Sequence, residues 1–192
     1  MPVPHRSDAR RNRAEILRVA DEEFTAERGP VRMKRIARLA GVAPATVYRH
    51  FPDRRALAVG VIEQQLVEIS ALVADRGEEP EAFRGLLRLV MERQASRRPL
   101  VALAQQMPPW QQQAYITGIT RIMAGPFQRA REAGLLRRDA EPADIALTLT
   151  MLEATIGLVA DQPDYPRTAR RAINLLLDGV CAPDRRPVTP SW

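Results

Sequence analysis

Residues 28–55 concentrate side chains that carry positive charge or donate hydrogen bonds. The segment holds eight Lys and Arg residues against one acidic residue, Asp53. Four polar side chains with donors near their tips lie close together in it: Thr46, Tyr48, Arg49 and His50. Hydroxyl, phenol and imidazole donors suit phosphate oxygens, and a guanidinium can also reach the edge of a guanine. The segment is therefore a candidate surface for nucleic acid.

The positive charge of the whole chain resides in its first third. Residues 1–60 hold 13 Lys and Arg and 7 Asp and Glu, a net charge of +6, which is also the formal charge of all 192 residues. The remainder is neutral in sum. A basic third joined to a neutral remainder indicates one part that meets a polyanion and another with a different task. Charge taken alone is explained equally well by a solvated, arginine-rich face.

Composition excludes several other classes of protein. With 45% hydrophobic and 27% charged residues, the chain matches a globular protein of one or two domains. Its single cysteine, Cys181, excludes an internal disulfide framework, and two histidines leave too few ligands for a structural zinc site. We therefore expect no metal and no cofactor. A small buried apolar residue is the simplest role for Cys181, and a redox sensor is the alternative.

The sequence shows neither the pattern of a membrane protein nor that of an enzyme. The longest apolar run, residues 56–62, is far shorter than a membrane span. We expect no secretory signal, so a cytoplasmic location is predicted. The sequence contains no recognisable pair of a nucleophile and the general base that would activate it, so we assign no catalytic residue. A small helical enzyme with an anionic substrate is the weaker hypothesis.

The apolar periodicity predicts an all-α fold. The expected helices cover residues 8–27, 33–39, 43–50, 53–75, 81–96, 99–107, 110–132, 142–160 and 166–180. We expect Gly29 and Pro30 to end the first helix, Asp53 to cap the fourth, and Gly125-Pro126 to interrupt the seventh. Residues 183–192 are expected to form a loose tail.

Two short helices joined by a three-residue turn predict a helix-turn-helix. Gly41 lies in that turn, where the chain reverses tightly and a positive φ favours glycine. The expected organisation is a helix-turn-helix DNA-binding domain over residues 8–53, a larger helical domain over residues 54–182, and the tail.

Four stretches of the first third match a known family. They are Arg-Arg-Asn-Arg-Ala-Glu-Ile-Leu (11–18), Phe-Thr-Ala-Glu-Arg-Gly (24–29), Ile-Ala-Arg-Leu-Ala-Gly-Val (36–42) and Ala-Thr-Val-Tyr-Arg-His-Phe-Pro-Asp-Arg-Arg-Ala-Leu (45–57). Through them, residues 11–62 resemble the N-terminal DNA-binding domain of the TetR family of bacterial transcriptional regulators. The resemblance implies a three-helix helix-turn-helix domain followed by a larger helical domain for ligand binding and dimerisation.

The resemblance also assigns roles to individual residues. It makes residues 43–49 the recognition helix. Positions that match phosphate contacts are Thr46, Tyr48, His50 and Arg54. Positions that match base contacts are Pro44, Ala45 and Arg49, while Lys34 matches one that reaches either a base or a phosphate. Three alternatives remain open: Arg49 gripping a phosphate, Tyr48 packing in the core, and His50 capping helix carbonyls.

Two departures from the family pattern concern helix caps. Arg32 and Ala43 stand where the family has Ser or Thr before the two short helices, and neither side chain can accept an amide hydrogen bond. Each lost cap is worth roughly 0.5–2 kcal/mol. We therefore expect the recognition helix to be less rigid without DNA than with it.

The last two helices indicate a second copy of the chain. A face of small side chains in the first of them lets helix backbones approach closely. The second has more apolar residues than one buried stripe needs. In TetR-like proteins these helices pair across a two-fold axis, which assigns the dimer interface to Ala146, Thr150, Ala154, Gly157, Ile173, Leu176 and Val180. The alternative is a buried hairpin in a monomer.

The resemblance implies a ligand pocket among the helices of residues 81–160. The candidate lining residues are Met91, Met107, Trp110, Tyr115 and Glu153. Residues of the first four types more often belong to an ordinary core than to a ligand pocket, and Glu153 is either a polar anchor in the pocket or an interface residue.

These observations predict a homodimeric transcriptional repressor that binds a palindromic operator in double-stranded DNA. A small, largely apolar effector would release it by shifting the population of conformations through the helix at 53–75. The alternative is a DNA-associated protein whose C-terminal domain docks a protein partner rather than a ligand.

Overall fold

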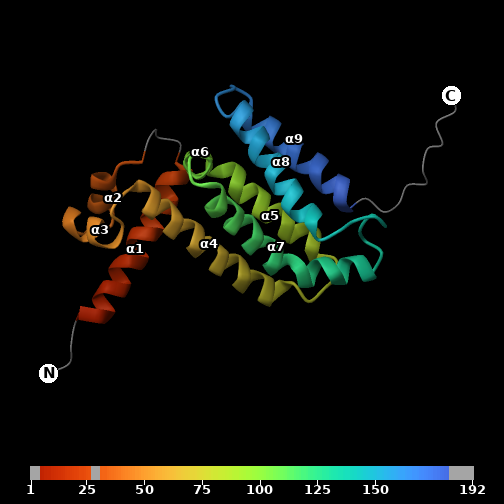
Figure 1. Cartoon of the computed structure of the whole chain (residues 1–192), viewed down its shortest axis with the longest axis horizontal. Coiled ribbons are helices and arrows are strands. Elements are labelled where there is room, and N and C mark those ends of the chain that lie inside the picture. The colour runs from red at the N-terminus through yellow and green to blue at the C-terminus, as the bar shows by residue number, and fades with distance from the viewer. Residues whose placement is uncertain (1–4, 27–30, 182–192) are drawn as a thin grey trace. The chain divides into compact units, whose positions relative to one another are not determined.

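The computed structural model describes residues 5–26 and 31–181, which form helices and no strand (Figure 1). The helices are α1 (His5–Thr25), α2 (Met33–Leu39), α3 (Pro44–His50), α4 (Arg54–Arg76), α5 (Ala82–Ser96), α6 (Arg98–Ala104), α7 (Pro109–Glu132), α8 (Ala143–Val159) and α9 (Tyr165–Cys181). The predicted all-α class is confirmed. Gly29, Pro30 and the expected tail at 183–192 lie outside the described residues.

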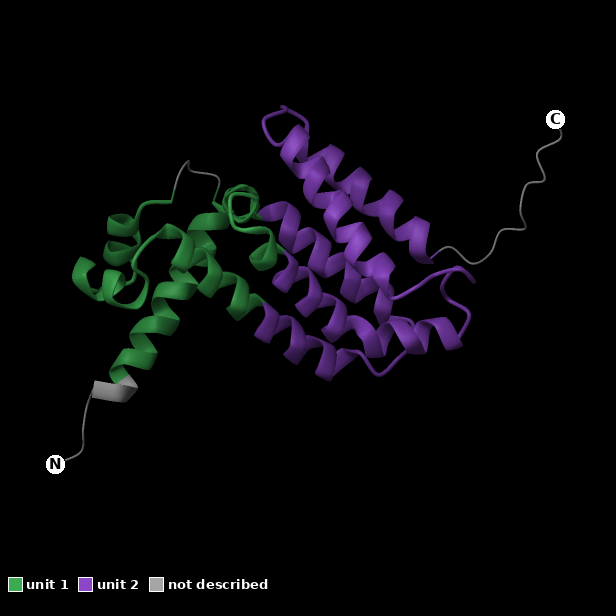
Figure 2. Ribbon diagram, viewed as in Figure 1, with its two compact units in different colours: residues 1–65, 97–112 green, residues 66–96, 113–192 purple. Residues whose placement is uncertain are grey.

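The chain divides into two compact units (Figure 2). The N-terminal unit comprises residues 1–65 and 97–112, and the C-terminal unit comprises residues 66–96 and 113–192. Helices α4 and α7 each contribute residues to both units. Helix α6 belongs to the N-terminal unit.

One face of α1 supplies the centre of the N-terminal unit. An apolar stripe of this helix is buried, each residue at most 3% exposed: Ile16, Leu17, Ala20 and Phe24. It packs in one core with α2, α3 and the start of α4, and α6 and the residues after it add Leu100, Leu103 and Met107. Burial of such side chains contributes about 25 cal/mol per Å² of apolar surface. This core fixes the helix-turn-helix to α1.

A carboxylate on α1 ties two distant segments of the N-terminal unit together. The Nε and Nη2 atoms of Arg97 donate to Asp21 at 2.6 and 2.7 Å. The Nε2 atom of Gln65 donates to the same carboxylate at 3.0 Å. A bidentate guanidinium–carboxylate pair is among the stronger hydrogen-bonded contacts in proteins. It positions the start of α6 and the middle of α4 against α1.

Helix α5 is the central element of the C-terminal unit. It packs against α8 and α9, which also pack along each other (Figure 1). The rings of Phe83 and Phe127 meet edge to face with centroids 5.5 Å apart. The hydroxyl of Tyr165 donates to the carbonyl of Ala95 at 2.7 Å. Aromatic packing and this buried hydrogen bond hold α7 and α9 to α5.

The predicted interruption at Gly125-Pro126 is wrong, because α7 is one helix through Pro126. A proline inside a helix removes one backbone hydrogen bond. The Pro126 ring is buried and lies 3.2 Å from the position that a Cβ on Gly77 would occupy. One turn later, the Nε of Arg129 donates to the Gly77 carbonyl at 2.8 Å. These tertiary contacts compensate for the missing hydrogen bond.

Helix α4 is long and apolar. An 18-residue window of it has a mean hydropathy of 1.5, so length and composition alone would let it cross a membrane. A helix that serves two protein cores has the same properties. Leu57 and Val61 are buried in the N-terminal unit, and Ile69 is buried in the C-terminal unit. Part of the apolar content of α4 is therefore core, and 33% of that window is buried.

Candidate DNA-binding surface

The turn between α2 and α3 has the backbone geometry that the sequence predicted. Gly41 has a φ of +64°, a conformation in which a β-carbon is costly. The N–H of Val42 donates to the carbonyl of Ala37 at 3.0 Å, and the N–H of Gly41 donates to that of Arg38 at 3.3 Å. This pair of bonds is the Schellman arrangement that closes a helix at a glycine. It ends α2 and directs the chain into α3.

Helix α3 is anchored by a single buried side chain. Val47 is 0% exposed and packs in the N-terminal core with Ile36 and Phe51. The other six residues of α3 reach the surface. Among them, the exposed ones are Pro44, Ala45, Tyr48 and Arg49, and the half-buried ones are Thr46 and His50. A helix held from one side presents the rest of its circumference to a partner.

The structure places the residues predicted to bind DNA on three successive elements. Lys34 is exposed on α2, and Arg54 is exposed at the first position of α4. The phenol-bearing side chain of Tyr48 is on the outside, since this residue is 45% exposed. That exposure removes the alternative in which Tyr48 packs in the core. The His50 ring lies beside the Phe51 ring, with centroids 6.3 Å apart.

The cations near α3 divide into paired and unpaired ones. Arg35 donates to Glu23 through two nitrogens, and this contact holds the pKa of Arg35 above its ordinary value. Within the part of the chain that the structure describes, no ion pair forms at Lys34, Arg49 or Arg54. Their charge remains available for phosphates, whose neutralisation releases condensed counterions.

The helix caps follow the sequence prediction. Arg32 and Ala43 are the N-caps of α2 and α3, and neither side chain makes a cap hydrogen bond. Pro44 occupies the first turn of α3 and sets its φ. Helix α4 is capped conventionally, because the N–H of Ala56 donates to Oδ1 of Asp53 at 2.8 Å. Both short helices of the helix-turn-helix therefore begin without a side-chain cap.

A glycine on α4 allows the end of α3 to pack closely. A Cβ on Gly60 would lie 2.7 Å from Cε1 of Phe51 and 3.0 Å from Cδ2 of Leu17. Both distances are shorter than ordinary van der Waals contact. Gly60 therefore lets the Phe51 ring, which directly follows α3, sit between α1 and α4.

The comparisons with known proteins agree with this geometry. Residues 16–61 match the family model described as bacterial regulatory proteins, tetR family. The TetR transcription regulatory protein from Mycobacterium vanbaalenii is 31% identical to this chain and superposes with a TM-score of 0.61. The match covers 93% of this chain and 99% of that protein. The chain belongs to the TetR family. It is thus a TetR-family transcriptional regulator with a helix-turn-helix DNA-binding domain.

Two other solved transcriptional regulators share the TetR fold of this chain. SCO0520 from Streptomyces coelicolor is 27% identical, with 88% of this chain and 98% of that chain covered and a TM-score of 0.59. FadR from Bacillus subtilis, solved in complex with stearoyl-CoA, is 18% identical, with 86% and 98% covered and a TM-score of 0.57. A search of curated proteins found no match.

The five residues predicted to line a TetR ligand pocket are divided between the two units. Met91 is fully buried in the C-terminal unit, where Tyr115 and Glu153 are half-buried. Burial raises the pKa of Glu153. Met107 belongs to the core of the N-terminal unit, and Trp110, in the same unit, is 69% exposed.

Gln94 is a buried polar residue that the sequence analysis missed. It is 8% exposed and continues the apolar face of α5 formed by Phe83, Leu87 and Val90. Its Nε2 donates to the Leu149 carbonyl at 3.5 Å, which fixes the amide orientation because a carbonyl only accepts. Its Oε1 has no hydrogen-bond partner among the described residues. The sequence signal for its burial was that Gln94 occupies a position where the helical spacing of α5 calls for an apolar residue.

Part of the predicted dimer face is accessible. On α8, Thr150, Ala154 and Gly157 are exposed and Ala146 is half-buried, whereas on α9 Ile173 and Val180 are buried and Leu176 is half-buried. Larger apolar side chains beside them are also exposed, by 49–81%: Leu147, Met151, Leu158 and Leu175. We call these four residues the α8–α9 apolar face.

The remaining chemistry-bearing groups are structural in character. Within residues 5–26 and 31–181, no group of three or more His, Cys, Asp or Glu side chains is placed to hold a metal ion. Cys181 is buried, and burial raises the pKa of its thiol against the opposing effect of Arg84. A protonated thiol reacts slowly, which favours packing over redox sensing as the role of Cys181.

Proposed function

We propose that this regulator is a repressor that binds a palindromic operator as a homodimer and leaves it when a small-molecule ligand binds. The observation that carries the DNA-binding part is the outward face of α3 with unpaired cations beside it. Tyr48 and Arg49 project from α3, and Lys34 and Arg54 lie on the neighbouring elements without ion pairs to described residues. Since its target is bacterial DNA, we propose that it acts in the cytoplasm.

The side chains of α3 support a division of labour on DNA. The guanidinium of Arg49 can make a bidentate contact with a guanine, which discriminates between bases by about 1–3 kcal/mol. Pro44 and Ala45 have no side-chain donors, so they suit contact with a thymine methyl group. Donors to phosphate would come from Thr46, Tyr48, His50 and Arg54, with Lys34 reaching a phosphate or a base. Phosphate contacts fix the register and carry no sequence information directly.

The DNA-binding proposal is tested by titrating the protein with its own upstream DNA and with scrambled DNA of the same composition. We expect Tyr48→Ala to weaken binding to both DNAs alike. Arg49→Ala should mainly erase the preference for the native DNA, by about 10-fold. Arg170→Ala, which removes an exposed arginine of α9, is the control and should change neither. Equal effects of Arg49→Ala and Arg170→Ala would contradict the assignment.

The homodimer proposal rests on the α8–α9 apolar face. Leu158 is 81% exposed, and a contiguous apolar surface of this kind marks an interaction site. The exposed small residues Thr150, Ala154 and Gly157 would allow close approach of a second copy. A two-fold dimer presents two recognition helices, so its operator would have half-sites about 34–36 Å apart.

Light scattering on the purified chain tests the dimer. Leu158→Glu should produce monomers, because it places a charge on the α8–α9 apolar face. Val67→Glu is the matched control, since Val67 is 63% exposed on α4 and should leave the dimer intact. If Leu158→Glu remains a dimer, the α8–α9 apolar face is instead a site for a protein partner, which is the second candidate for the C-terminal unit.

The ligand part of the proposal rests on the family and on polar groups inside the C-terminal unit. FadR from Bacillus subtilis was solved with stearoyl-CoA, and we propose that this chain also takes a largely apolar ligand. Buried Gln94 and half-buried Glu153 offer polar contacts, and Met91 offers apolar ones. Because α4 has residues in both units, a ligand that prefers one arrangement of α4 would shift the population of DNA-binding conformations. Candidate ligands that weaken operator binding without unfolding the protein would support this.

A further inference from the structure

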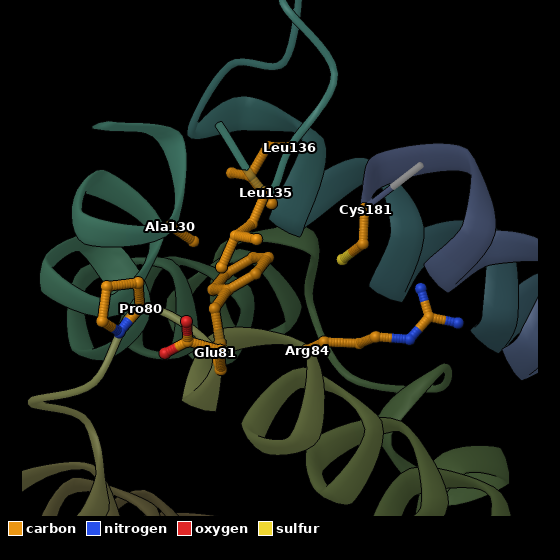
Figure 3. A pocket seen from close by; sticks show the side chains of 8 residues that line it. Pro80, Glu81, Arg84, Ala130, Leu135, Leu136 and Cys181 are labelled. Carbon is orange, nitrogen blue, oxygen red and sulfur yellow. The ribbon is translucent and has the colours of Figure 1, made fainter. Parts of the chain in front are cut away.

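The C-terminal unit contains a cavity of about 200 Å³ that the pocket predicted from the sequence does not include. It lies where the start of α5, the end of α7, the segment after α7 and the end of α9 meet (Figure 3). Its lining residues are Pro80, Glu81, Phe83, Arg84, Ala130, Leu135, Leu136 and Cys181. None of the five residues predicted to bind a ligand is among them.

The interior of the cavity is apolar and of the size of one ring. Phe83 and Ala130 are 1% exposed and Leu136 is 5% exposed, so the wall is part of the packed core. An engineered apolar cavity of about 150 Å³ holds benzene. A cavity of about 200 Å³ therefore has room for a single ring or a short branched chain with one small substituent.

The two charged side chains at the rim, Arg84 and Glu81, differ in whether they have an ion-pair partner. The Nη2 of Arg84 donates to Oδ1 of Asp178 at 2.6 Å, and Arg84 also interacts with the Cys181 thiol. That cation is therefore already neutralised. The Glu81 carboxylate, on the opposite side of the cavity in Figure 3, forms no ion pair or hydrogen bond with a described residue. The side of the rim formed by Glu81 thus has a negative charge without a counter-ion.

The negative charge extends beyond the lining residues. Glu78 and Glu79 are exposed and precede Glu81 by three and two positions. A neutral ligand would gain only from the apolar wall, and an anionic ligand would meet repulsion from Glu81. A cation would add the weak attraction of one exposed ion pair, about 2–5-fold in affinity.

We propose that this cavity binds small lipophilic amines, with one ring or a short branched chain against Phe83 and Leu136 and the ammonium group facing Glu81. The proposal names a ligand class for the C-terminal unit and thereby extends the proposed ligand response. Binding of an amine in the cavity does not depend on DNA, so the cavity proposal and the repressor proposal can fail separately.

The only cysteine of the chain reports on the cavity. Cys181 lines it and is 9% exposed, so an occupant should shield the Sγ from a small thiol reagent. The rate of reaction with methyl methanethiosulfonate is measured on the full chain with increasing 2-phenylethylamine. 2-Phenylethanol and 3-phenylpropanoate are the neutral and anionic probes, and glutathione reports any direct effect of a probe on the reagent.

We expect saturable protection by 2-phenylethylamine with a midpoint of roughly 1 mM, as suits a ligand of this size. The alcohol should need about 2–5-fold higher concentration, in line with one exposed ion pair, and the carboxylate should protect least. Glu81→Gln should make amine and alcohol equal. Glu92→Gln, an exposed acid of α5 outside the cavity, should keep the preference for the amine.

Leu135→Trp separates binding in the cavity from binding elsewhere. Leu135 is half-buried in the segment after α7, so a larger side chain there fills the cavity without entering the centre of the core. The cavity assignment is overturned if 2-phenylethylamine protects Cys181 equally in this variant, or if protection never saturates. Equal protection by the three probes overturns the assignment of an amine. Because the assay contains no DNA, either result leaves the repressor proposal standing, and loss of operator binding leaves the cavity proposal standing.

Discussion

Replacing Gln94 by leucine should stabilise the protein, although it removes a hydrogen bond. The Oε1 of Gln94 is buried without a partner among the described residues, which costs about 1–3 kcal/mol. The hydrogen bond lost from Nε2 to Leu149 is long, at 3.5 Å, and is worth about 0.5 kcal/mol. Leucine has a similar volume, so no cavity opens. The net expectation for Gln94→Leu is a gain of about 0.5–2.5 kcal/mol, or roughly 1–10 °C in Tm for a chain of this size.

The assay is urea unfolding of both proteins at one fixed concentration, since dimer formation would make stability concentration-dependent. Gln65→Leu is the matched control. Gln65 is also buried, at 5% exposed, but its Nε2 donates to Asp21 at 3.0 Å. Removing a donor from a partly buried carboxylate should cost about 1–2 kcal/mol. The same substitution is therefore expected to have opposite signs at the two glutamines.

A loss of stability in Gln94→Leu would show that the buried Oε1 of Gln94 does not destabilise the fold. It would mean that Oε1 of Gln94 has a hydrogen-bond partner in solution, such as a bound water or a ligand retained during purification. A gain of similar size in both variants would contradict the expected opposite signs. It would show that burial of apolar surface outweighs the satisfied hydrogen bond of Gln65 as well.

Three further changes test other parts of the structure. Gly60→Ala should destabilise the N-terminal unit by about 1–3 kcal/mol, since its Cβ would lie 2.7 Å from Phe51; amide exchange in α3 should rise, and unchanged exchange would contradict the packing. Asp53→Ala should cost about 0.5–2 kcal/mol in urea unfolding by removing the cap on the Ala56 N–H, and Asp53→Asn should restore most of it. Burial raises the pKa of Glu153, so its ionised form weakens the fold as pH rises through that pKa. Glu153→Gln should therefore be more stable than the parent at pH 7, and the difference should vanish below the ordinary Glu pKa of 4.5; a pH-independent difference would show that titration is not its cause.

Local rules were sufficient for the helix-turn-helix. The positive φ of Gly41, the cap at Asp53 and the absent caps at Arg32 and Ala43 depend on residues within a few positions of each other. The outward face of α3 also follows from local spacing, because Val47 alone points to the core.

Contacts between segments that are distant in the chain could not be predicted from local sequence patterns. The sequence left Met107 open between a ligand pocket and a core, and no local pattern shows that it joins the N-terminal core. The continuation of α7 through Pro126 depends on Gly77 and Arg129, which compensate for the lost hydrogen bond from other positions. The cavity depends on residues from four separate segments, and no local pattern brings these together.

In the proposed dimer, two copies of α3 read a palindromic site. Selection of bound sequences from a pool of random duplex DNA tests it without any assumption about where the operator lies. We expect enrichment of an inverted repeat whose half-site centres are about 10 base pairs apart, and loss of the enriched bases with Arg49→Ala. Enrichment of a single unrepeated half-site, or an unchanged motif with Arg49→Ala, would contradict it.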